Sequence, residues 1–459
     1  MQNTLRGTVG VQSFVDSQRF RAYHYGVFAL CVLGLLFDGF DVQSMGFVAP
    51  AMRADMGFAA SALGPVFSAS LFGMLIGALI FGSLADRIGR RPVLIGALAL
   101  CGVAMCYCST ATSLHEVMIV RFITGLGLGT MLPTSLAVAS EIAPSRYRSV
   151  VVMLMSLGFV GGAALGGAIA AHLIPAHGWR SVFVFAGVGS LISAVVQLLW
   201  LPEPLQFIVE SSGGGELPRA MKVARKLSGD RTLPDFVWQS ERMLESKVAA
   251  SRSIAEPFRE GYAATTLLLW VINFANLLDL YLMSSWLPTL LSQAKLPLQT
   301  AVIASTVLQS GGVPATLLLS VLSRYIRLTS IMVVNFLIGT AAMITIGFAV
   351  HASVPLLFVA IFLAGFCVVG GQSGVNALGA YYYPTTMRAA GMGWASGIGR
   401  FGSVSGPLFG GMFLILGWGP EAVFFGAASA GLLGMLATFV LQWRARPAAH
   451  ELGAAVAMH

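Results

Sequence analysis

Charged residues are scarce in this sequence. Only 10% of its 459 residues are Asp, Glu, Lys or Arg, whereas an ordinary soluble domain carries roughly a quarter. Hydrophobic residues make up 56% of the chain, and the mean hydropathy is +0.81. This balance excludes a soluble fold, so we expect the chain to lie in a lipid bilayer.

Cysteine is also rare, and no cysteine shows the spacing of a metal or disulfide site. The five cysteines lie within apolar runs, away from histidines, and are expected to be free buried thiols: Cys31, Cys101, Cys106, Cys108 and Cys367. No phosphate-binding lysine loop is present, and the glycine-rich run 125–129 lies in an apolar segment where glycine allows close helix contacts. We therefore expect no metal, no cofactor, no ATP-driven step and no enzymatic activity.

The sequence does contain many apolar runs of the length that crosses a bilayer, about 20 residues each. The expected helices are 24–50, 60–84, 92–111, 115–140, 149–173, 180–201, 263–291, 299–322, 329–350, 355–380, 388–416 and 420–443. Lipid offers no partner to an unpaired backbone, and the strands of a β-barrel would alternate in polarity, so helices follow. The expected fold is an all-α membrane protein with 12 transmembrane helices.

Basic residues gather in alternate loops. Arginines of the segments 87–91, 146–148, 219–259, 324–327 and 444–446 fall on one side of the predicted membrane, and the other side holds Arg53, Arg180 and Lys295. By the positive-inside rule, both termini and the long central loop lie in the cytoplasm. We expect a multi-pass protein of a bacterial inner (cytoplasmic) membrane. The net charge of +8 is explained by topology and does not indicate a nucleic-acid partner.

The chain divides into two similar halves. Residues 121–144 match residues 361–384 without a gap, and each segment is followed four residues later by an arginine, Arg148 or Arg388. The same offset brings Asp279 within one residue of the position of Asp38. The expected parts are a tail (1–22), a six-helix bundle (23–201), a linker (202–262), a second six-helix bundle (263–443) and a tail (444–459). Such pseudo-symmetric bundles place a substrate site between them near the midplane. The segments 218–226 and 236–247 of the linker are expected to be short helices, and we expect a monomer.

The loop after the second expected helix closely resembles the signature of the major facilitator superfamily. Residues 82–91 read GSLADRIGRR, and the signature positions are Gly82, Asp86, Arg87, Gly89, Arg90 and Arg91. Asp86 is placed to pair with arginines of the loop or with a neighbouring helix end, while Gly82 and Gly89 allow tight packing and a sharp turn. The counterpart in the second half keeps Arg324 and Arg327 but lacks the aspartate and the glycine.

Within that superfamily, Asp38-Gly39-Phe40-Asp41 is similar to the signature of the aromatic acid:proton symporter family. The stretches 141–148, 383–388 and 400–411 resemble the same family. The resemblance implies secondary active uptake of benzoate-like carboxylates, driven by protons. Two other functions remain open: a proton-coupled porter of a sugar or another organic acid, such as an aliphatic dicarboxylate or sugar acid, and a membrane receptor for an aromatic acid.

Asp38 and Asp41 are one helical turn apart, on nearly the same face and near the middle of the membrane. A charged carboxylate there costs several kcal/mol, so a functional role is the default. Two like charges this close favour proton uptake by one of them. Proton coupling, with a slight preference for Asp41, is the leading interpretation; a structural ion pair and direct substrate contact are the alternatives. Asp279 is either a proton site or a partner of Arg400.

Two arginines are expected to meet anions. Arg121 stays charged and pairs with Asp38 or Asp41. It is either a substrate-binding residue, for which the substrate carboxylate or a proton competes with that pair, or a fixed structural bridge. Arg400, flanked by glycines in the eleventh expected helix, is the candidate clamp for the substrate carboxylate, and Asp279 is the competing partner. The candidates for contact with the aromatic ring and its hydroxyls are Phe37, Phe40, Tyr381, Trp394, Phe401, Asn273, Asn276, Gln372, Ser373 and Asn376.

A gate is expected on the cytoplasmic side. Glu141, with Arg146 and Arg148 just beyond it, is predicted to form a charge cluster with the 86–91 loop that closes the inner side when the site faces outward. Breaking such pairs accompanies rocking of the two halves. Arg324, Arg327 and Arg388 are the corresponding residues of the second half.

Overall fold

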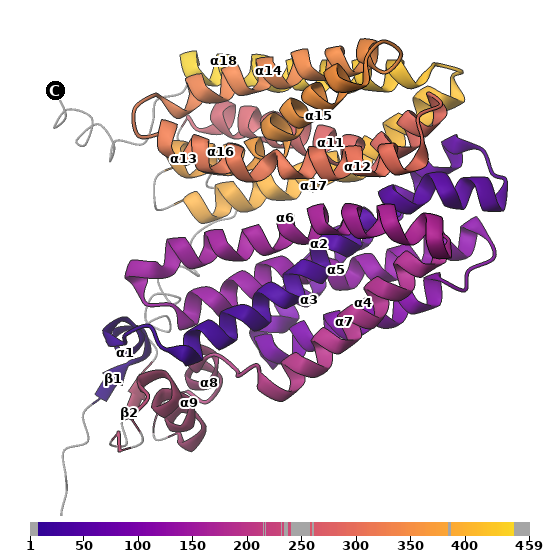
Figure 1. Ribbon diagram of the computed structural model, residues 1–459. Helices are drawn as coiled ribbons and strands as arrows, with labels where there is room; N and C mark the ends of the chain where they lie inside the picture. The colour runs from indigo at the N-terminus through magenta and orange to yellow at the C-terminus, as the bar shows by residue number, and fades with distance from the viewer. Residues whose placement is uncertain are drawn as a thin grey trace, which may run out of the picture.

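The computed structural model describes residues 8–444, apart from 214, 216, 231, 234–236, 240–257, 259–260 and 384–386. Within this part of the chain the secondary structure is helical apart from two three-residue strands. The long helices form two layers of roughly parallel rods (Figure 1). The first layer comes from the first half of the chain and the second from the second half. We call them the N-bundle and the C-bundle.

The N-bundle contains six long helices. They are α2 (Ala22–Met56), α3 (Leu63–Ile88), α4 (Arg90–Cys108), α5 (Leu114–Ile142), α6 (Ser145–His177) and α7 (Arg180–Trp200), with the short 3-10 helix η1 (Ala60–Ala62) before α3. Helices α3 and α5 approach closely because each has a glycine at the contact: a Cβ on Gly73 would lie 2.2 Å from the Phe122 carbonyl oxygen. A Cβ on Gly125 would lie 2.1 Å from the carbonyl oxygen of Ser70. This contact sets where the start of α5 sits against α3.

The C-bundle repeats this plan with two broken helices. Its helices are α11 (Ala263–Gln293), α12 (Leu298–Ser310), α13 (Gly312–Leu322), α14 (Leu328–Ala349), α15 (Val354–Val368), α16 (Gly371–Tyr382), α17 (Arg388–Ile415) and α18 (Pro420–Arg444). The breaks between α12 and α13 and between α15 and α16 fall at Gly311 and Gly370. All twelve expected runs are therefore found as helical segments, and the expected all-α architecture of two helix bundles is confirmed.

Eleven segments in the described part of the chain are long and apolar enough to cross a membrane. Helix α17 is outside this set although it has 28 residues and packs against α11 and α3. It carries Arg400 and a series of glycines and serines between residues 391 and 411, which lower its hydropathy. The least apolar long helix is thus the one that holds the candidate substrate arginine.

The N-terminal tail folds against the central linker, which the sequence did not predict. Five short elements form this unit, which we call the cap: β1 (Thr8–Gly10), α1 (Val11–Ser17), α8 (Leu205–Ser211), α9 (Pro218–Ser228) and β2 (Val237–Gln239). Strand β1 pairs in parallel with β2, and Trp238 of β2 is 1% exposed with the Phe14 ring edge-on at 5.3 Å. The tail contributes the buried apolar side chains of Val11, Phe14 and Val15 to this core, although most of its other residues are polar.

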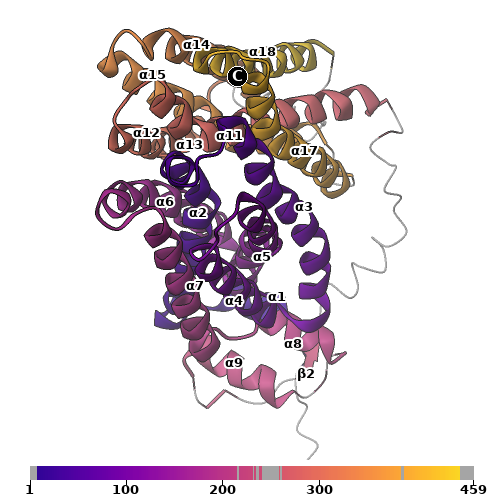
Figure 2. The ribbon, with the colours of Figure 1, turned by 90° about the vertical axis from the view of Figure 1, so that its right-hand side faces the viewer.

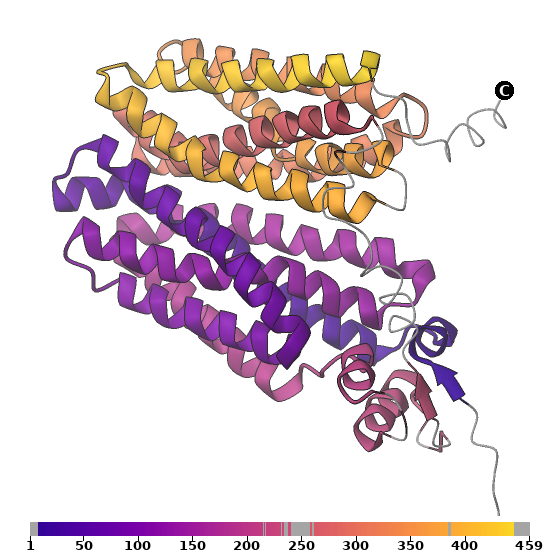
Figure 3. The same cartoon turned by 180° about the vertical axis from the view of Figure 1, so that it is seen from behind.

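The cap lies at one end of the N-bundle (Figures 1 and 3). We call this end of the molecule the linker side and the other end the opposite side. Helix α9 confirms the helix expected at 218–226. Most of the helix expected at 236–247 falls outside the described residues, and Val237–Gln239 form a strand because they pair with the tail.

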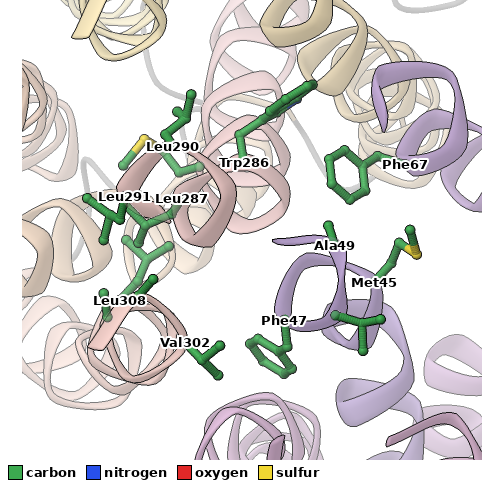
Figure 4. Packing of buried hydrophobic residues seen from close by; sticks show 14 of the residues in the cluster. Met45, Phe47, Ala49, Phe67, Trp286, Leu287, Leu290, Leu291, Val302 and Leu308 are labelled. Atoms are coloured by element: carbon green, nitrogen blue, oxygen red, sulfur yellow. The ribbon is translucent and has the colours of Figure 1, made fainter. Parts of the chain in front are cut away.

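The two bundles meet along α2 with α11, α3 with α17 and α6 with α12 (Figure 2). The closest approaches lie toward the opposite side, where Ser68 Oγ donates a hydrogen bond to the Val404 carbonyl at 2.7 Å. A Cβ on Gly46 would lie 2.7 Å from the Ser284 carbonyl oxygen. In the apolar core shared by both bundles, the Phe67 ring lies edge-on to Trp286 at 5.3 Å (Figure 4). The bundles are therefore closed against each other on the opposite side.

Candidate functional site

Asp41 of α2 and Arg121 of α5 form a fully buried ion pair. Arg121 Nη1 lies 2.6 Å from Asp41 Oδ1, and each side chain is 1% exposed. The other terminal nitrogen of Arg121 donates to the Asp41 carbonyl oxygen at 3.1 Å and approaches Ser70 Oγ at 3.4 Å. The two charges thus neutralise each other, as a buried ion pair requires, although Asp41 Oδ2 and Arg121 Nε have no hydrogen-bond partner among the described residues. Of the two aspartates that the sequence offered, the structure pairs Asp41 with Arg121.

Asp38 lies one turn away from Asp41 and has a different environment. It is 2% exposed, and its Oδ1 has no hydrogen-bond partner among the described residues. The charges that act on it are Asp41, of the same sign, and Arg400, of the opposite sign. Arg400 belongs to the C-bundle, so Asp38 faces a cation across the bundle interface.

A cavity of ≈ 400 Å³ lies between the bundles on the linker side. Its walls come from α3, α5, α17 and the first residue of α4. They include Gly82, Asp86 and Arg90 at one end and Arg400 in α17. The α17 lining residues Gly393, Gly397 and Arg400 share one helical face. Small residues on that face leave the guanidinium accessible, and Arg400 is half-buried. The volume suits a small organic molecule.

Predicted polar residues of α11 and α16 form a hydrogen-bonded network beside this region. Asn276 Nδ2 donates to Gln372 Oε1 at 2.7 Å, and Gln372 Nε2 donates to Asn376 Oδ1 at 3.1 Å. Asn273 packs against Gly399, because a Cβ there would lie 3.3 Å from its Oδ1. The network therefore reaches the residue next to Arg400. Ser373 lies apart from it and shares a 3.0 Å hydrogen bond with Thr316 of α13.

Asp279 faces the interior of the C-bundle. It is 1% exposed, and its Oδ2 lies 3.4 Å from the position that a Cβ on Gly431 of α18 would take, next to Thr340 of α14. Among the described residues it forms no ion pair with Arg400, which lines the cavity between the bundles. In this conformation the Asp279 carboxyl turns toward α14 and α18, so its pairing with Arg400 stays a prediction.

The aromatic candidates are spread over several places. Phe37 fits against Gly189 of α7, and Phe40 packs on Phe185 at 5.5 Å. Neither lines the cavity beside Arg400, because both point toward α6 and α7. Trp394 is 38% exposed, and its ring lies tilted against Trp270 at 5.6 Å. Tyr381 meets the edge of the Tyr382 ring, and the Phe401 side chain is 54% exposed.

The predicted gate residues form a charge cluster inside the N-bundle. Arg90, the first residue of α4, lies 2.8 Å from Glu141 Oε1 of α5 and 3.8 Å from Asp86 of α3. The Glu141 side chain is 5% exposed and that of Asp86 is 75% exposed, so the bond to Glu141 dominates. The cluster also borders the cavity, because Arg90 and Asp86 both line it.

Glu203 is the gate residue that sequence reasoning missed. It follows α7, and its Oε1 accepts the backbone N–H groups of Arg90 at 2.7 Å and Arg91 at 3.3 Å. A carboxylate at the start of α4 accepts hydrogen bonds from N–H groups that have no partner within the helix. Its negative charge also interacts favourably with the positive end of the helix dipole. Burial raises the pKa of Glu203, and these two N–H donors offset that effect only in part. The signal was visible in the proline-flanked Glu203 after the sixth apolar run.

The two signature glycines have different roles. Gly89 has φ +109°, which L side chains rarely adopt, and a Cβ there would lie 2.8 Å from Glu203 Oε2. The sharp turn expected there is confirmed. Gly82 has open space around its Cβ position, so the tight packing expected of it is wrong; it lines the cavity instead.

The remaining gate arginines have local partners. Arg148 donates to the Ser140 carbonyl at 3.1 Å, and Arg388 donates to the Tyr383 carbonyl at 3.3 Å. Arg91 donates to the Leu198 carbonyl at 2.5 Å. Arg87, Arg324 and Arg327 are exposed at helix ends. These bonds brace individual helices within one bundle.

Tyr281 of α11 is a second residue that the sequence did not single out. It stands within the electrostatic reach of both Asp38 and Arg400, and it lines a chamber of ≈ 10 Å³ together with Ser285, Gln43 and Arg121. This chamber has room for about one water. A tyrosine in an apolar helix gives no sequence signal of its own, because most such residues pack against neighbours.

The arrangement of two bundles around paired buried charges matches a known family of transporters. The family model for the Major Facilitator Superfamily matches residues 31–352 and 269–457. The chain belongs to the Major Facilitator Superfamily. It is thus a multi-pass membrane protein of a transporter family and not an enzyme.

Curated relatives cover nearly the whole chain. The 4-hydroxybenzoate transporter PcaK of Pseudomonas putida is 38% identical over 92% of this chain and 93% of its own length. The gallate transporter of the same organism is 36% identical over 96% and 97%. The 3-(3-hydroxy-phenyl)propionate transporter of Escherichia coli is 33% identical over 90% and 93%.

Solved structures support the fold. The xylose transporter XylE from E. coli, in a partially occluded inward-open conformation, has a TM-score of 0.70 and 15% identity, and the match covers 93% of this chain and 99% of that one. A bacterial homologue of the lysosomal transporter Spinster has a TM-score of 0.71 and 16% identity over 94% and 100%.

Proposed function

We propose that this protein is a secondary active transporter that imports a small aromatic carboxylate, of the hydroxybenzoate type, together with protons. The substrate class is supported by relatives that are named as transporters of 4-hydroxybenzoate, gallate and 3-(3-hydroxy-phenyl)propionate. Proton coupling is supported by two observations taken together: Asp38 is buried without a hydrogen-bond partner for its Oδ1 among the described residues, and Arg400 of the other bundle lies within its electrostatic range. Asp279 Oδ1 also lacks a partner, but burial alone acts on that carboxyl.

Charge balance links the proton to the substrate. Asp41 and Arg121 neutralise each other, so one titratable carboxyl, Asp38, and one permanent cation, Arg400, remain in the centre. When no substrate is bound, an ionised Asp38 balances Arg400. When a substrate carboxylate binds the Arg400 fork, Asp38 must hold a proton on its carboxyl, because an extra anion in a buried site costs several kcal/mol. Substrate anion and proton therefore bind together.

This assignment shifts the proton from Asp41 to Asp38. Sequence reasoning slightly preferred Asp41, but a carboxylate held 2.6 Å from a guanidinium favours its charged form. Asp38 has no such bond. We therefore assign the proton to Asp38 and a structural role to Asp41.

The bundles move around this centre. In the observed conformation the opposite side is closed by the Ser68–Val404 contact, and the cavity reaches the exposed Asp86 on the linker side. Substrate and proton are released on the linker side, which we assign to the cytoplasm because its loops carry most of the basic residues. When the bundles rock, the linker side closes and the opposite side opens to the external solution.

The decisive experiment is uptake by proteoliposomes that contain the purified protein. Radiolabelled 4-hydroxybenzoate and gallate are expected to accumulate under an inward proton gradient and to leave again when a protonophore is added. Succinate, gluconate and xylose serve as competitors and as labelled substrates in parallel. Accumulation of one of these without any aromatic acid would replace our substrate class. Accumulation that ignores the protonophore would overturn proton coupling.

A further inference from the structure

A second cavity of the N-bundle lies away from the candidate substrate site. It has a volume of ≈ 710 Å³ and runs between the linker-side halves of α2 and α6. Its walls are apolar along the helices and include Val32, Leu36, Leu154 and Gly158, and at the linker side it ends among Phe20, Tyr25 and Tyr147. We call this cavity the α2–α6 groove. None of the residues around Arg400 lines it.

The α2–α6 groove opens to the outer surface of the N-bundle. Val150 and Leu154 of α6 are 55% and 52% exposed, and the same helical face continues to Leu165, which is 58% exposed. The C-bundle lies on another face of α6, because Gly167 is the residue that meets Thr306 of α12. Two residues along a helix point in nearly opposite directions. The groove therefore faces the hydrocarbon of the bilayer.

An aromatic cluster closes the linker-side end of the groove. The Phe20 ring meets Tyr147 edge-on at 4.8 Å, Tyr25 at 5.5 Å and Phe28 at 5.6 Å. Aromatic rings with an exposed polar end, such as Tyr25 at 64% exposure, collect at the boundary between hydrocarbon and headgroups. The cluster marks the level of the headgroups at this end of the groove.

Exposed arginines stand at the same end. Arg146 lies 4.9 Å from the centre of the Tyr147 ring and donates to the Gln18 carbonyl at 3.1 Å, and Arg19 is the neighbour of Phe20 in sequence. Nearby acids already have other partners: Asp16 accepts from Ser145 and Gln12. Arg21 stands beside Asp230, so we leave it out of the site. Arg19 and Arg146 thus offer positive charge where headgroup phosphates lie.

We infer that the α2–α6 groove binds an anionic phospholipid of the linker-side leaflet, with one acyl chain along α2 and α6 and the headgroup phosphate on Arg19 and Arg146. The apolar walls account for the chain, the aromatic cluster for the depth, and the two arginines for the preference for negative charge. A zwitterionic lipid fills the same walls but gains less from the arginines.

Native mass spectrometry of the purified protein tests the inference. The protein is mixed with equal amounts of phosphatidylglycerol and phosphatidylethanolamine that carry identical acyl chains. The wild type is expected to retain phosphatidylglycerol in preference. Arg146→Gln is expected to lower that preference about five-fold, and Arg19→Gln/Arg146→Gln further, because each basic residue near a membrane surface contributes about that factor.

Matched variants separate the site from general effects. Arg444→Gln removes an exposed arginine from the end of α18 in the C-bundle and is expected to leave the preference unchanged. Arg19→Lys/Arg146→Lys keeps the charge and is expected to keep most of the preference, which also controls for the Gln18 bond and for folding. Ala29→Trp fills the groove and should reduce retention of both lipids, whereas Leu165→Trp on the same face outside the groove should not.

Three results would overturn the inference. Equal retention of the two lipids by the wild type would remove the charge preference. An equal loss in Arg444→Gln would make the effect a general one of surface charge. Displacement of the lipid by 4-hydroxybenzoate would make the groove a site for aromatic acids instead. These measurements report lipid retention and do not depend on transport. A failure of the lipid inference can therefore be told apart from a failure of the proposed function.

Discussion

Arg121 and Asp41 bond at 2.6 Å in the core of the N-bundle, while Asp38, one turn from Asp41, has an oxygen without a hydrogen-bond partner among the described residues. Asp41 Oδ2 also lacks a hydrogen-bond partner, so the two aspartates differ in the guanidinium that is bonded to Asp41 alone. Asp41 is paired with an arginine of its own bundle, whereas Asp38 is under the influence of Arg400 in the C-bundle. This difference generates the first two predictions.

Removing one member of the buried pair should destabilise the protein. Asp41→Asn leaves Arg121 buried without its counter-charge, and the loss should be about 3–5 kcal/mol. The double variant Asp41→Asn/Arg121→Gln should recover part of it, because no unpaired charge remains. Thermal unfolding of the purified variants measures both. A double variant less stable than Asp41→Asn would contradict the pairing.

Asp38→Asn should separate exchange from accumulation. The amide resembles the protonated carboxyl, so labelled substrate should still exchange across the membrane at equal concentrations, while accumulation driven by a proton gradient should be lost. Asp279→Asn is the matched control, because it removes another fully buried carboxyl from the C-bundle interior. Loss of coupling in Asp279→Asn, with coupling intact in Asp38→Asn, would move the proton site to Asp279.

Arg400→Lys should weaken substrate binding while it keeps the charge. A lysine cannot offer two parallel N–H groups to a carboxylate, and the loss of one charge-assisted bond should raise the KM roughly ten-fold. The pH dependence of uptake should change little, because a cation still faces Asp38. Arg444→Lys, at the exposed end of α18, serves as the control. An unchanged KM in Arg400→Lys would exclude Arg400 from the binding site.

Glu203 should give the protein a measurable pH dependence of stability. Because burial raises the pKa of Glu203 in the folded state, folding takes up a proton at this residue. Its contribution to stability is therefore fully present below the usual pKa of a glutamate and is lost as the pH rises through the folded-state value. The melting temperature of the wild type minus that of Glu203→Gln should be more positive at pH 4.5 than at pH 8. A difference that shrinks as the pH falls would reverse the assigned direction.

The glycine contact between α3 and α5 should not tolerate a methyl group. A Cβ on Gly125 would lie 2.1 Å from the Ser70 carbonyl oxygen, so Gly125→Ala must push the helices apart. We expect a loss of roughly 1–3 kcal/mol and reduced transport, because Arg121 lies one turn away on α5. Gly96→Ala, where nothing lies within 4 Å of the Cβ position, should be neutral or slightly stabilising. Equal melting temperatures for the two variants would refute the packing argument.

Much of the fold was predictable because hydrocarbon constrains a chain so strongly. Apolar runs of membrane length and the bias of arginines among loops gave all twelve helical segments. The breaks at Gly311 and Gly370 were not predicted, because glycine within an apolar run is equally compatible with a continuous helix.

The site was predictable in its charges and less so in its neighbours. A charged residue inside the membrane has few acceptable surroundings, so Asp38, Asp41, Arg121 and Arg400 stood out in the sequence. Which aspartate takes Arg121 depends on a rotation of α2 that periodicity does not define. Phe37 and Phe40 point toward α6 and α7, and nothing in an apolar helix distinguishes a ring that packs from a ring that binds.

The pairing of β1 with β2 has a consequence for how the protein is made. Thr8 finds its partner Val237 only after the first six membrane helices and the start of the linker have left the ribosome. The strand pair joins the two ends of the N-bundle into a ring, and every residue of this ring precedes α11 in the chain. A chain that ends shortly after residue 239 should therefore fold as a unit. The cap would then stabilise the N-bundle before the C-bundle has formed.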